Sequence, residues 1–397
     1  MTSLGTIGID YTPAYEQGAG IGRLTRDLVT ALLAYDSATQ YKLFISGASH
    51  SELKSAPAPN GVWKPTRLSP TWLARIWHRT QLPVPVEAFT GQVDLYHATD
   101  FTLPPTFPST KTIVTVHDLS FVRVPDAASA RLRAYLNAVV PRSVKRATHV
   151  LADSQATKDD LCELYGLQDA DVTVLLSGID ARYEPIIDIG WIMTTRNKYS
   201  ISDKPYIFSI GTVQPRKNYS RLIRALKIIR ERGLDVQLVI AGGKGWLEGE
   251  MYKTLDETGM REHVNLIGFV DDEDVPTLYS GAECVAYISL YEGFGFPVLE
   301  GMACGTPVVT SNVSSLPEVA GDVAIMVDPY EVEAIADAIE TVLTDSDLRD
   351  DMIQRGYIHA RQFTWEKSAR KLHTIYRDIL SMFCQAQIRL RRFQHTL

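Results

Sequence analysis

The amino-acid sequence predicts an α/β protein of two doubly wound domains, and three observations lead to that prediction. The chain has 397 residues, more than one hydrophobic core usually serves, so two domains are expected. Short apolar runs alternate with amphipathic segments of helix length, the pattern of parallel sheets with helical crossovers. Hydrophobic residues make up 45% and charged residues 22% of the chain, which is typical of a soluble globular protein and excludes a disordered or fibrous one.

The first half of the chain holds six apolar runs that predict strands and three amphipathic stretches that predict helices. The strands are expected at Thr6–Asp10, Tyr41–Ser46, Asp94–Ala98, Thr112–Val116, Thr148–Ala152 and Val172–Leu176. The helices are expected at Gly22–Tyr35, Ala128–Arg146 and Gln155–Tyr165.

The second half repeats this alternation with six more strand candidates. They lie at Tyr206–Ile210, Gln237–Ala241, Asn265–Gly268, Cys284–Ile288, Pro307–Thr310 and Ala324–Val327. Residues 179–205 between the halves have little hydrophobic periodicity and hold the breaker clusters YEP, IDIG and SDKP. We therefore expect a Rossmann-like N-terminal domain at 1–185, a linker at 186–205 and a Rossmann-like C-terminal domain at 206–365.

Two segments stand outside this alternation. Residues 366–397 predict a C-terminal helix that returns to the N-terminal domain; its basic end, IRLRRFQHTL, also suits a solvated or frayed end, or weak contact with anionic lipid. Residues 51–91 combine prolines with three tryptophans and predict a long insertion. Such an insertion is either a functional loop facing the acceptor or a helix whose tryptophans cover the sheet edge.

Composition limits the partners and the compartment. The net charge of −7 gives no global attraction to nucleic acid, so no nucleic-acid partner is expected. Four separated cysteines, Cys162, Cys284, Cys304 and Cys384, predict reduced thiols and neither a disulfide framework nor a metal site. No signal peptide or long apolar run is evident, which indicates a cytoplasmic protein whose membrane contact, if any, is peripheral at the inner face.

A glycine-rich turn between two glutamates follows the strand that ends near Ser289. Glu292 precedes Gly293-Phe294-Gly295, and Glu300 lies one turn into the helix that Pro297 begins. Ligands of open parallel sheets bind beyond the carboxyl ends of the strands, and a helix N-terminus attracts anions. The turn is therefore a candidate site for a diphosphate or a sugar, with the two carboxylates free to hold different hydroxyls.

Other candidates follow neighbouring strands. Arg216 and Lys217 lie just past the strand that ends at Ile210; cations at a helix start oppose its dipole, so we expect an anionic group to compensate them. His117 and Asp118 follow the run TIVTV, where an isolated histidine is more often structural. The segment from Gly18 to Arg23 is an imperfect glycine-rich loop without the acidic residue that an NAD site requires. Ser154 begins a helix, and capping alone explains a serine there.

The sequence resembles the retaining GT-B glycosyltransferases of family 4. The segments that carry the resemblance are YEGFGFPVLEGMACGTPVVTSNVSSLPEVAGDVAIMVDP, SIGTVQPRKNYSRLIRAL, HATDFTLP, TVHDLSF and THVLADSQATKDDL. They cover most of the chain and include the Glu, seven residues, Glu motif of that family. The resemblance implies a GT-B fold, in which two Rossmann-like domains face each other across a cleft.

The resemblance also implies roles for individual residues. Glu300 would bind the ribose, Glu292 the donor sugar with the turn Gly293-Phe294-Gly295 beside it, and Arg216 with Lys217 the donor diphosphate. His117 would contact the sugar and belongs with Arg216, Lys217 and Glu292 to the expected catalytic residues. Further donor-binding residues are Gly20, Arg23, Ser154 and Gly211. A guanidinium and an ammonium can stabilise a leaving phosphate without a metal, so no metal and no resident cofactor are expected.

The expected activity is transfer of a hexose, with retention of configuration, from a nucleotide sugar to a saccharide or lipid-linked saccharide. The resemblance of GTVQPRKN and EGFGFPVLE to bacterial mannosyltransferases favours GDP-mannose as the donor. UDP-sugars, a sugar-nucleotide epimerase and a non-catalytic GT-B scaffold stay open as alternatives, as does the oligomeric state. A glycoside hydrolase that uses Glu292 and Glu300 as its acid and base leaves Arg216 and Lys217 without a purpose.

Overall fold

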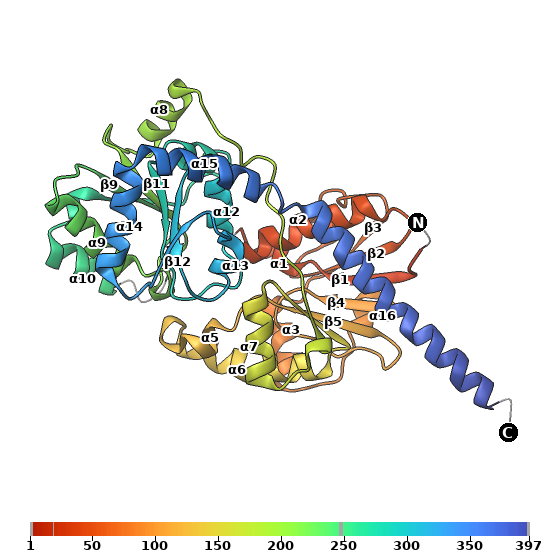
Figure 1. Cartoon of the computed structure of the whole chain (residues 1–397). Helices are drawn as coiled ribbons and strands as arrows, with labels where there is room; N and C mark the ends of the chain where they lie inside the picture. Colours follow the sequence, from red (N-terminus) through yellow and green to blue (C-terminus); the bar gives the residue numbers. More distant parts are fainter. Residues whose placement is uncertain (1–2, 19, 246–248, 395–397) are drawn as a thin grey trace. The chain divides into compact units, whose positions relative to one another are not determined.

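The computed structural model describes residues 3–18, 20–245 and 249–394, with side chains as far as residue 381 in the last helix. The chain forms two compact units (Figure 1). The first consists of Met1–Leu119, Ala134–Gly178 and Thr364–Leu397, and the second of Ser120–Arg133 and Ile179–Phe363. Each unit is built on one parallel sheet, so the predicted fold class of two Rossmann-like doubly wound domains is confirmed. The cleft between the domains stays a prediction.

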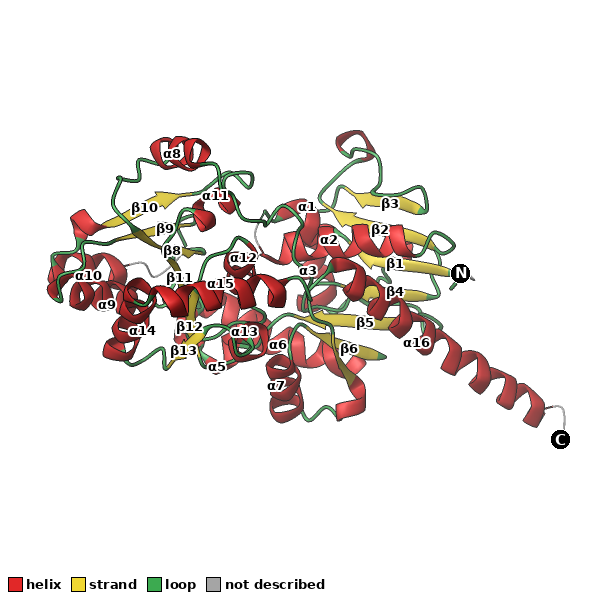
Figure 2. Ribbon diagram, turned by 45° about the horizontal axis from the view of Figure 1, so that its top comes forward, coloured by secondary structure: helices red, strands yellow, loops and turns green. Residues whose placement is uncertain are grey.

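The first unit contains a seven-stranded parallel sheet. Its strands are β1 (Thr6–Asp10), β2 (Gln40–Ser46), β3 (Gly61–Thr66), β4 (Leu95–Ala98), β5 (Lys111–Val116), β6 (His149–Ala152) and β7 (Val172–Val174). Their order in the sheet is β3-β2-β1-β4-β5-β6-β7. Figure 2 shows the strands from β3 across to β6 side by side in this order. The order reverses between β1 and β4, which makes that point the topological switch of the sheet.

Helices connect these strands and cover the sheet. They are α1 (Thr12–Glu16), α2 (Gly20–Tyr35), α3 (Pro70–Ala74), α4 (Glu87–Thr90), α6 (Ala130–Arg146), whose first turn belongs to the second unit, α7 (Gln155–Tyr165) and α16 (Trp365–Gln394). Helix α16 packs along α2 (Figure 1). The hydroxyl of Tyr376 lies 2.7 Å from Nδ1 of the buried His97 on β4, and Ser368 donates a hydrogen bond to the carbonyl of Leu176. These contacts fix the described part of the last helix on the first unit.

The interpretation of residues 51–91 as a long loop insertion is wrong, whereas the alternative of a helix whose tryptophans cover the sheet is borne out in part, since Trp77 packs on Phe44 of β2. The segment contains β3, which pairs with β2 at the edge of the sheet, and then α3, a π-helical turn at Arg75–Arg79 and α4. Lys64 and Pro65 interrupt the apolar pattern of β3 and conceal the strand in the sequence. An edge strand tolerates a proline because one side of its backbone needs no sheet partner.

The second unit contains a six-stranded parallel sheet in the order β10-β9-β8-β11-β12-β13. The strands are β8 (Tyr206–Ile210), β9 (Gln237–Ala241), β10 (Val264–Gly268), β11 (Cys284–Tyr287), β12 (Val308–Ser311) and β13 (Ile325–Val327). The helices are α5 (Ser120–Arg123), α8 (Ile189–Lys198), α9 (Tyr219–Glu231), α10 (Gly249–Thr258), α11 (Val275–Ser280), α12 (Phe296–Ala303), α13 (Leu316–Ala320), α14 (Val332–Thr344) and α15 (Ser346–Ala360). The switch point lies between β8 and β11.

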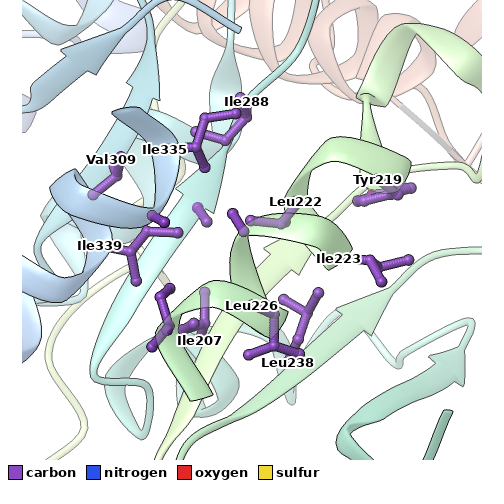
Figure 3. Close-up of a cluster of buried hydrophobic side chains, with 14 of the residues drawn as sticks. Ile207, Tyr219, Leu222, Ile223, Leu226, Leu238, Ile288, Val309, Ile335 and Ile339 are labelled. Atoms are coloured by element: carbon purple, nitrogen blue, oxygen red, sulfur yellow. The ribbon is translucent and has the colours of Figure 1, made fainter. Parts of the chain in front are cut away.

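The core of the second unit lies between this sheet and the helices α9 and α14 (Figure 3). On α9 the buried residues Tyr219, Leu222, Ile223 and Leu226 follow the spacing of one helix face. They pack with strand residues such as Ile207, and Ile335 and Ile339 of α14 join the same cluster. This packing holds the N-terminus of α9, and the turn before it, at the carboxyl end of β8.

The segment at 186–205, expected to be a linker, holds helix α8. It is fixed to the second unit by a polar contact with α11: Lys198 and Tyr199 bind Asp274 at 2.5 and 2.7 Å. Its weak hydrophobic periodicity reflects exposure, since Thr195 is the buried residue of this helix. None of the helices in the described part of the chain combines the length and the apolar composition needed to cross a bilayer.

Candidate functional site

The predicted charged residues of the second unit meet at its topological switch point. The turn from Gly211 to Lys217 follows β8, and the segment from Ser289 to Glu292 follows β11, its neighbour in the sheet. The amide of Leu290 donates a 2.8 Å hydrogen bond to the carbonyl of Arg216, which joins the two segments. The switch point therefore brings Arg216 and Lys217 together with Glu292, as ligand sites of open parallel sheets require.

The carboxylate of Glu292 is the centre of this cluster. Its Oε2 accepts a short hydrogen bond from Arg216, and its Oε1 lies 2.7 Å from Nζ of Lys217. Oε1 also accepts a 2.8 Å hydrogen bond from the hydroxyl of Tyr287, which in turn contacts Nζ of Lys217. Glu292 is thus the anionic group that the cationic turn was expected to need.

The cluster is nearly closed to solvent. The side chains of Glu292, Lys217 and Arg216 are 8%, 9% and 16% exposed. Burial alone would raise the pKa of Glu292, but the charges of Arg216 and Lys217 outweigh it and lower the pKa to about 2. Burial and the neighbouring carboxylate raise the pKa of Tyr287, which stays a phenol. The site therefore holds two cations against one anion, an excess of positive charge that suits a diphosphate.

The backbone fixes the cations before any ligand arrives. Arg216 and Lys217 lie in a 3-10 turn, Pro215–Lys217, that precedes α9. Asn218 ends the turn in the left-handed conformation at φ 59°. Arg216 also donates a 2.7 Å hydrogen bond to the carbonyl of Tyr291. The guanidinium is therefore held by two acceptors on one loop and has little freedom to lose on binding.

Gly211 makes room for the lysine. Its φ of 150° is in the region that favours glycine, and a Cβ there would lie 2.9 Å from Cε of Lys217. A Cβ on Gly242 would lie 2.1 Å from the carbonyl oxygen of Gly211, so Gly242 must also be a glycine. Two glycines thus allow the backbone of neighbouring strand ends to approach closely under the lysine side chain.

The glycine turn leads into α12 as predicted. Gly295 has a φ of 117° at the N-cap, and Pro297 lies in the first turn. Glu300 is buried and accepts a 2.8 Å hydrogen bond from the hydroxyl of Tyr279. Glu292 and Glu300 thus bind different partners.

Helix α13 and the loop before it hold the turn between Glu292 and Gly295 in place. The amide of Glu292 donates a 2.9 Å hydrogen bond to Ser314, and Ser315 donates to the carbonyls of Glu292 and Phe294. Gly295 approaches Leu316 so closely that a Cβ would lie 2.8 Å from its side chain. These contacts set the path of the segment Glu292 to Gly295.

His117, in the first unit, is a buried histidine between two acceptors. Its Nδ1 lies 2.8 Å from the carboxylate of Asp153 at the end of β6, and its Nε2 lies 2.9 Å from the carbonyl of Thr99 at the end of β4. Burial would lower the pKa of the imidazole, but Asp153 and Asp100 raise it to about 9. Because both ring nitrogens face acceptors, the ring is held in place and its doubly protonated form is favoured.

Ser154 has a local structural role. Its hydroxyl accepts a 3.2 Å hydrogen bond from the amide of Thr157 and caps α7. The hydroxyl of Thr157 donates to the carbonyl of His117 at 3.2 Å. The serine therefore supports the His117 loop through the helix start, and its contact with a donor stays a prediction.

Gly20 and Arg23 lie in the first turn of α2, and Ala19 of the same loop is outside the described residues. A Cβ on Gly22 would lie 2.0 Å from the carbonyl of Gln17, so the close approach of α1 explains that glycine. Arg26 donates hydrogen bonds to the carbonyls of Ala14 and Gln17 and holds the same loop. Gly20, Arg23, His117 and Ser154 belong to the first unit, whereas the cluster around Glu292 belongs to the second.

Sequence reasoning missed the residues that orient the charged groups. Tyr287, Ser314 and Ser315 were not selected, nor was Asp153. Tyr287 and Asp153 each stand at or just past the end of an apolar strand run, which is the one signal that could have marked them. The two serines carry no signal of their own because they reach the glycine turn from a loop more than twenty residues later.

The three cysteines whose side chains are described, Cys162, Cys284 and Cys304, are free thiols, as expected. The side chain of Cys384 lies outside the described residues.

Comparison with known proteins identifies the class. A family model described as glycosyl transferases group 1 matches residues 193–359, and one described as glycosyltransferase family 4 matches residues 18–183. O-antigen chain mannosyltransferase B of Escherichia coli is 33% identical over 285 residues, which cover 71% of this chain and 74% of that protein. With two parallel-sheet domains and a cationic switch point, the protein is a glycosyltransferase. The chain belongs to family 4, and the predicted resemblance is confirmed.

Solved structures show the same fold. Sucrose-phosphate synthase from Thermosynechococcus elongatus has a TM-score of 0.72 at 18% identity, over 96% of this chain and 100% of that one. Anabaena Alr3699/HepE in complex with UDP and glucose has a TM-score of 0.70 at 19% identity, over 94% of this chain and 98% of that one. At these identities the likeness concerns the fold alone.

The ion pairs of Glu292 predict a stability that depends on pH. The pKa of this carboxyl is lowered from 4.5 to about 2, so its stabilising effect is complete above pH 4.5 and disappears as the pH falls toward 2. Glu292→Gln leaves two partly buried cations without their anion and should cost about 3 kcal/mol of unfolding free energy at neutral pH. Thermal unfolding across this pH range measures both effects.

Glu283→Gln is the matched control, because Glu283 pairs with Arg349 at 3.0 Å near the surface. That substitution should cost less than about 1 kcal/mol. Equal stability of the two variants at neutral pH would contradict the role given to Glu292.

The geometry of His117 predicts that its ring stays doubly protonated until about pH 9. Its contribution to stability is complete below pH 6.5 and is lost as the pH rises through about 9. Asp153→Asn should lower the ring pKa, because the attracting charge is removed. NMR spectra of the histidine ring nitrogens test this, with His97 as an internal reference: burial lowers its pKa to about 3, so it stays neutral. Titration of wild-type His117 near pH 6.5 would refute the assignment.

Proposed function

We propose that this protein transfers mannose, with retention of configuration and without a metal, from GDP-mannose to a saccharide or lipid-linked saccharide. The observation that carries the proposal is the pair of cations, Arg216 and Lys217, held at the switch point of the second unit by Glu292. A leaving nucleoside diphosphate develops negative charge, and preorganised cations in a nearly closed site stabilise that charge strongly.

Arg216 and Lys217 provide the charge that a divalent cation supplies in other transferases. The guanidinium is already fixed by Glu292 and the carbonyl of Tyr291, and the ammonium by Glu292 and Tyr287. Fixed donors cost no reorganisation when the bond to the diphosphate breaks. This arrangement supports a metal-independent reaction.

The proposed chemistry needs no enzyme nucleophile. The acceptor hydroxyl attacks the anomeric carbon on the face from which the diphosphate leaves, and a phosphate oxygen takes the hydroxyl proton as the new glycosidic bond forms. Glu292 is unsuited to attack, because both its oxygens are engaged with Arg216, Lys217 and Tyr287. Configuration is then retained by geometry, and catalysis rests on positioning and electrostatics.

The remaining residues take supporting roles in this proposal. Glu300, buried under Tyr279, binds the ribose, and the turn from Gly293 to Gly295 presents its backbone to the donor. In the first unit, the imidazolium of His117 acts as a fixed positive charge near the sugar, with Gly20 and Arg23 at the start of α2. Asp118, which follows His117, supports the loop.

Two of the comparisons bear on the choice of donor, and they point to different nucleotides. The Escherichia coli relative is named as an O-antigen chain mannosyltransferase, which favours GDP-mannose as donor and a surface polysaccharide as acceptor. Alr3699/HepE binds UDP and glucose on the same fold, which keeps a UDP-sugar as the alternative donor. Experiments with both nucleotides are therefore required.

Lys217→Ala should lower turnover by about a hundredfold to a thousandfold while the fold survives, because one preorganised charge at the leaving group is removed. Lys227→Ala is the matched control, since this lysine lies on the exposed side of α9 and pairs with Glu231 at 3.6 Å. Steady-state rates with the donor at saturation measure the effect. Turnover of Lys217→Ala equal to that of the control would remove the lysine from the catalytic site.

The donor is tested by thermal unfolding with GDP, UDP, ADP and their sugar conjugates in the presence of a chelator. A nucleotide at a hundred times its dissociation constant stabilises the native state by about 2.7 kcal/mol. We expect selective stabilisation by GDP and GDP-mannose. Selective stabilisation by UDP would show that the donor is a UDP-sugar. No response to any nucleotide would refute a transferase site.

Product analysis then separates transfer from its alternatives. An α-mannoside formed from the α-linked donor shows retention; epimerised nucleotide sugar, or no product, would support an epimerase or a non-catalytic scaffold.

A further inference from the structure

The segment that replaces the predicted insertion is an amphipathic helix with a distinct outer face. Helix α3 and the π-helical turn after it run without interruption from Pro70 to Arg79. Leu73 and Trp77 are buried against the first unit. Trp72, Arg75 and Arg79, at helical spacing on the other side, are exposed.

The inner face fixes the helix in place. The indole nitrogen of Trp77 donates a 2.8 Å hydrogen bond to the carbonyl of Val84, and its ring packs against Phe44 on β2 and Phe89 on α4, with centroids 6.3 and 6.1 Å away. Packing alone therefore explains Trp77, one of the three tryptophans of this segment. Trp63 is explained in the same way, since its ring packs on Tyr11 at 5.1 Å.

Trp72 has no such explanation. It is 56% exposed. Leu68, which precedes the helix in sequence, and Leu82, which follows it, are 40% and 51% exposed. The guanidinium of Arg75 lies over the indole, 4.9 Å from its centroid. We call the exposed set Leu68, Trp72, Arg75, Arg79 and Leu82 the Trp72 face.

The charged residues of the segment that carries this face have one sign, although the carboxylate of Glu16 adjoins Gly47 together with Pro70 at the start of α3. The sequence from Leu53 to Val86 contains five lysines and arginines and no aspartate or glutamate, although the whole chain has a net charge of −7. These residues are Lys54, Lys64, Arg67, Arg75 and Arg79. A basic segment in an acidic protein indicates a partner that is locally anionic.

An open hollow of about 430 Å³ lies beside the segment, lined by Ala48, Ser49, His50, Ser51, Pro65 and Arg67. It offers a guanidinium, an imidazole and hydroxyl groups, which suit a phosphate headgroup. Glu52, its nearest acidic neighbour in sequence, accepts a 2.7 Å hydrogen bond from the amide of Ser49, and this bond together with the charge of Arg67 lowers the pKa of Glu52.

We infer that the Trp72 face binds the surface of an anionic phospholipid bilayer. Tryptophan at the headgroup level, exposed leucines at the acyl boundary and flanking arginines on lipid phosphates are the elements of interfacial binding. The exposed leucines and the indole gain from burial in lipid, which a soluble anionic saccharide does not offer. A symmetric contact with a second copy would bring two basic segments together, and like charges repel.

A second exposed tryptophan provides a contrast. Trp191 on α8 is 54% exposed, like Trp72, but the charged residues nearest to it in sequence are Asp188 and Arg196, one of each sign. An anionic bilayer attracts the basic segment around Trp72 more strongly than this segment of mixed charge. The two tryptophans therefore form a matched pair for experiment.

Flotation of the full chain with lipid vesicles tests this inference, and it needs neither donor nor turnover, so its outcome is independent of the proposed function. The protein should float with vesicles of phosphatidylcholine and phosphatidylglycerol, float less as salt is raised, and stay unbound with phosphatidylcholine alone. Arg75→Ala with Arg79→Ala should lower the partition coefficient roughly thirtyfold, about fivefold for each arginine.

Trp72→Ser should also weaken binding, whereas Trp191→Ser and the pair Lys253→Ala with Arg261→Ala should leave it unchanged. Circular dichroism confirms that each variant is folded. Failure of the wild type to float with anionic vesicles, or equal loss in the Trp72 and Trp191 variants, overturns the inference. A Trp72-dependent dimer without vesicle binding would also overturn it and assign the face to a second copy.

Discussion

The ion pairs of Glu292 with Arg216 and Lys217 are the interaction on which the site of the second unit depends. A buried carboxylate and two partly buried cations are each costly alone, and each is tolerable because the others are present. Because the cations outnumber the anion, the cluster keeps positive charge for a ligand. The same contacts join the loop after β8 to the loop after β11, so the strand ends and the electrostatics of the site are fixed together.

The fold supplies the geometry for this interaction. Strands β8 and β11 are parallel neighbours because the order of strands in the sheet reverses at this point, which leaves their two loops side by side. Helix α9 is held by the core residues Leu222 and Leu226, and its start carries the cationic turn. Glycines at 211 and 242 allow the strand ends to approach. In the first unit the same logic places His117 between Thr99 and Asp153, at the ends of three adjacent strands.

Much of this organisation could be predicted from the sequence, since apolar runs mark buried parallel strands clearly. The boundaries of β1, β8 and β9 are as predicted, and those of the other expected strands differ by one or two residues. β3 was missed because an edge strand is half solvated and tolerates Lys64 and Pro65. Helix α8 was missed because it is mostly exposed and has little periodicity.

The candidate residues were found, but their contacts were not. The sequence showed that Arg216 and Lys217 need a counter-ion and did not show that Glu292 is that group, because the pairing depends on which strands are neighbours. The two nitrogens of His117 could not be assigned partners for the same reason. Local patterns predict elements well, whereas contacts between distant segments follow from sheet order.

The most direct test of this account is a crystal structure of the complex with GDP, together with a second one with UDP. The account predicts that the terminal phosphate lies within about 3 Å of Arg216 and of Nζ of Lys217, with Glu292 still supporting both cations. A nucleotide whose phosphates lie elsewhere, with the three side chains paired only to one another, would contradict it.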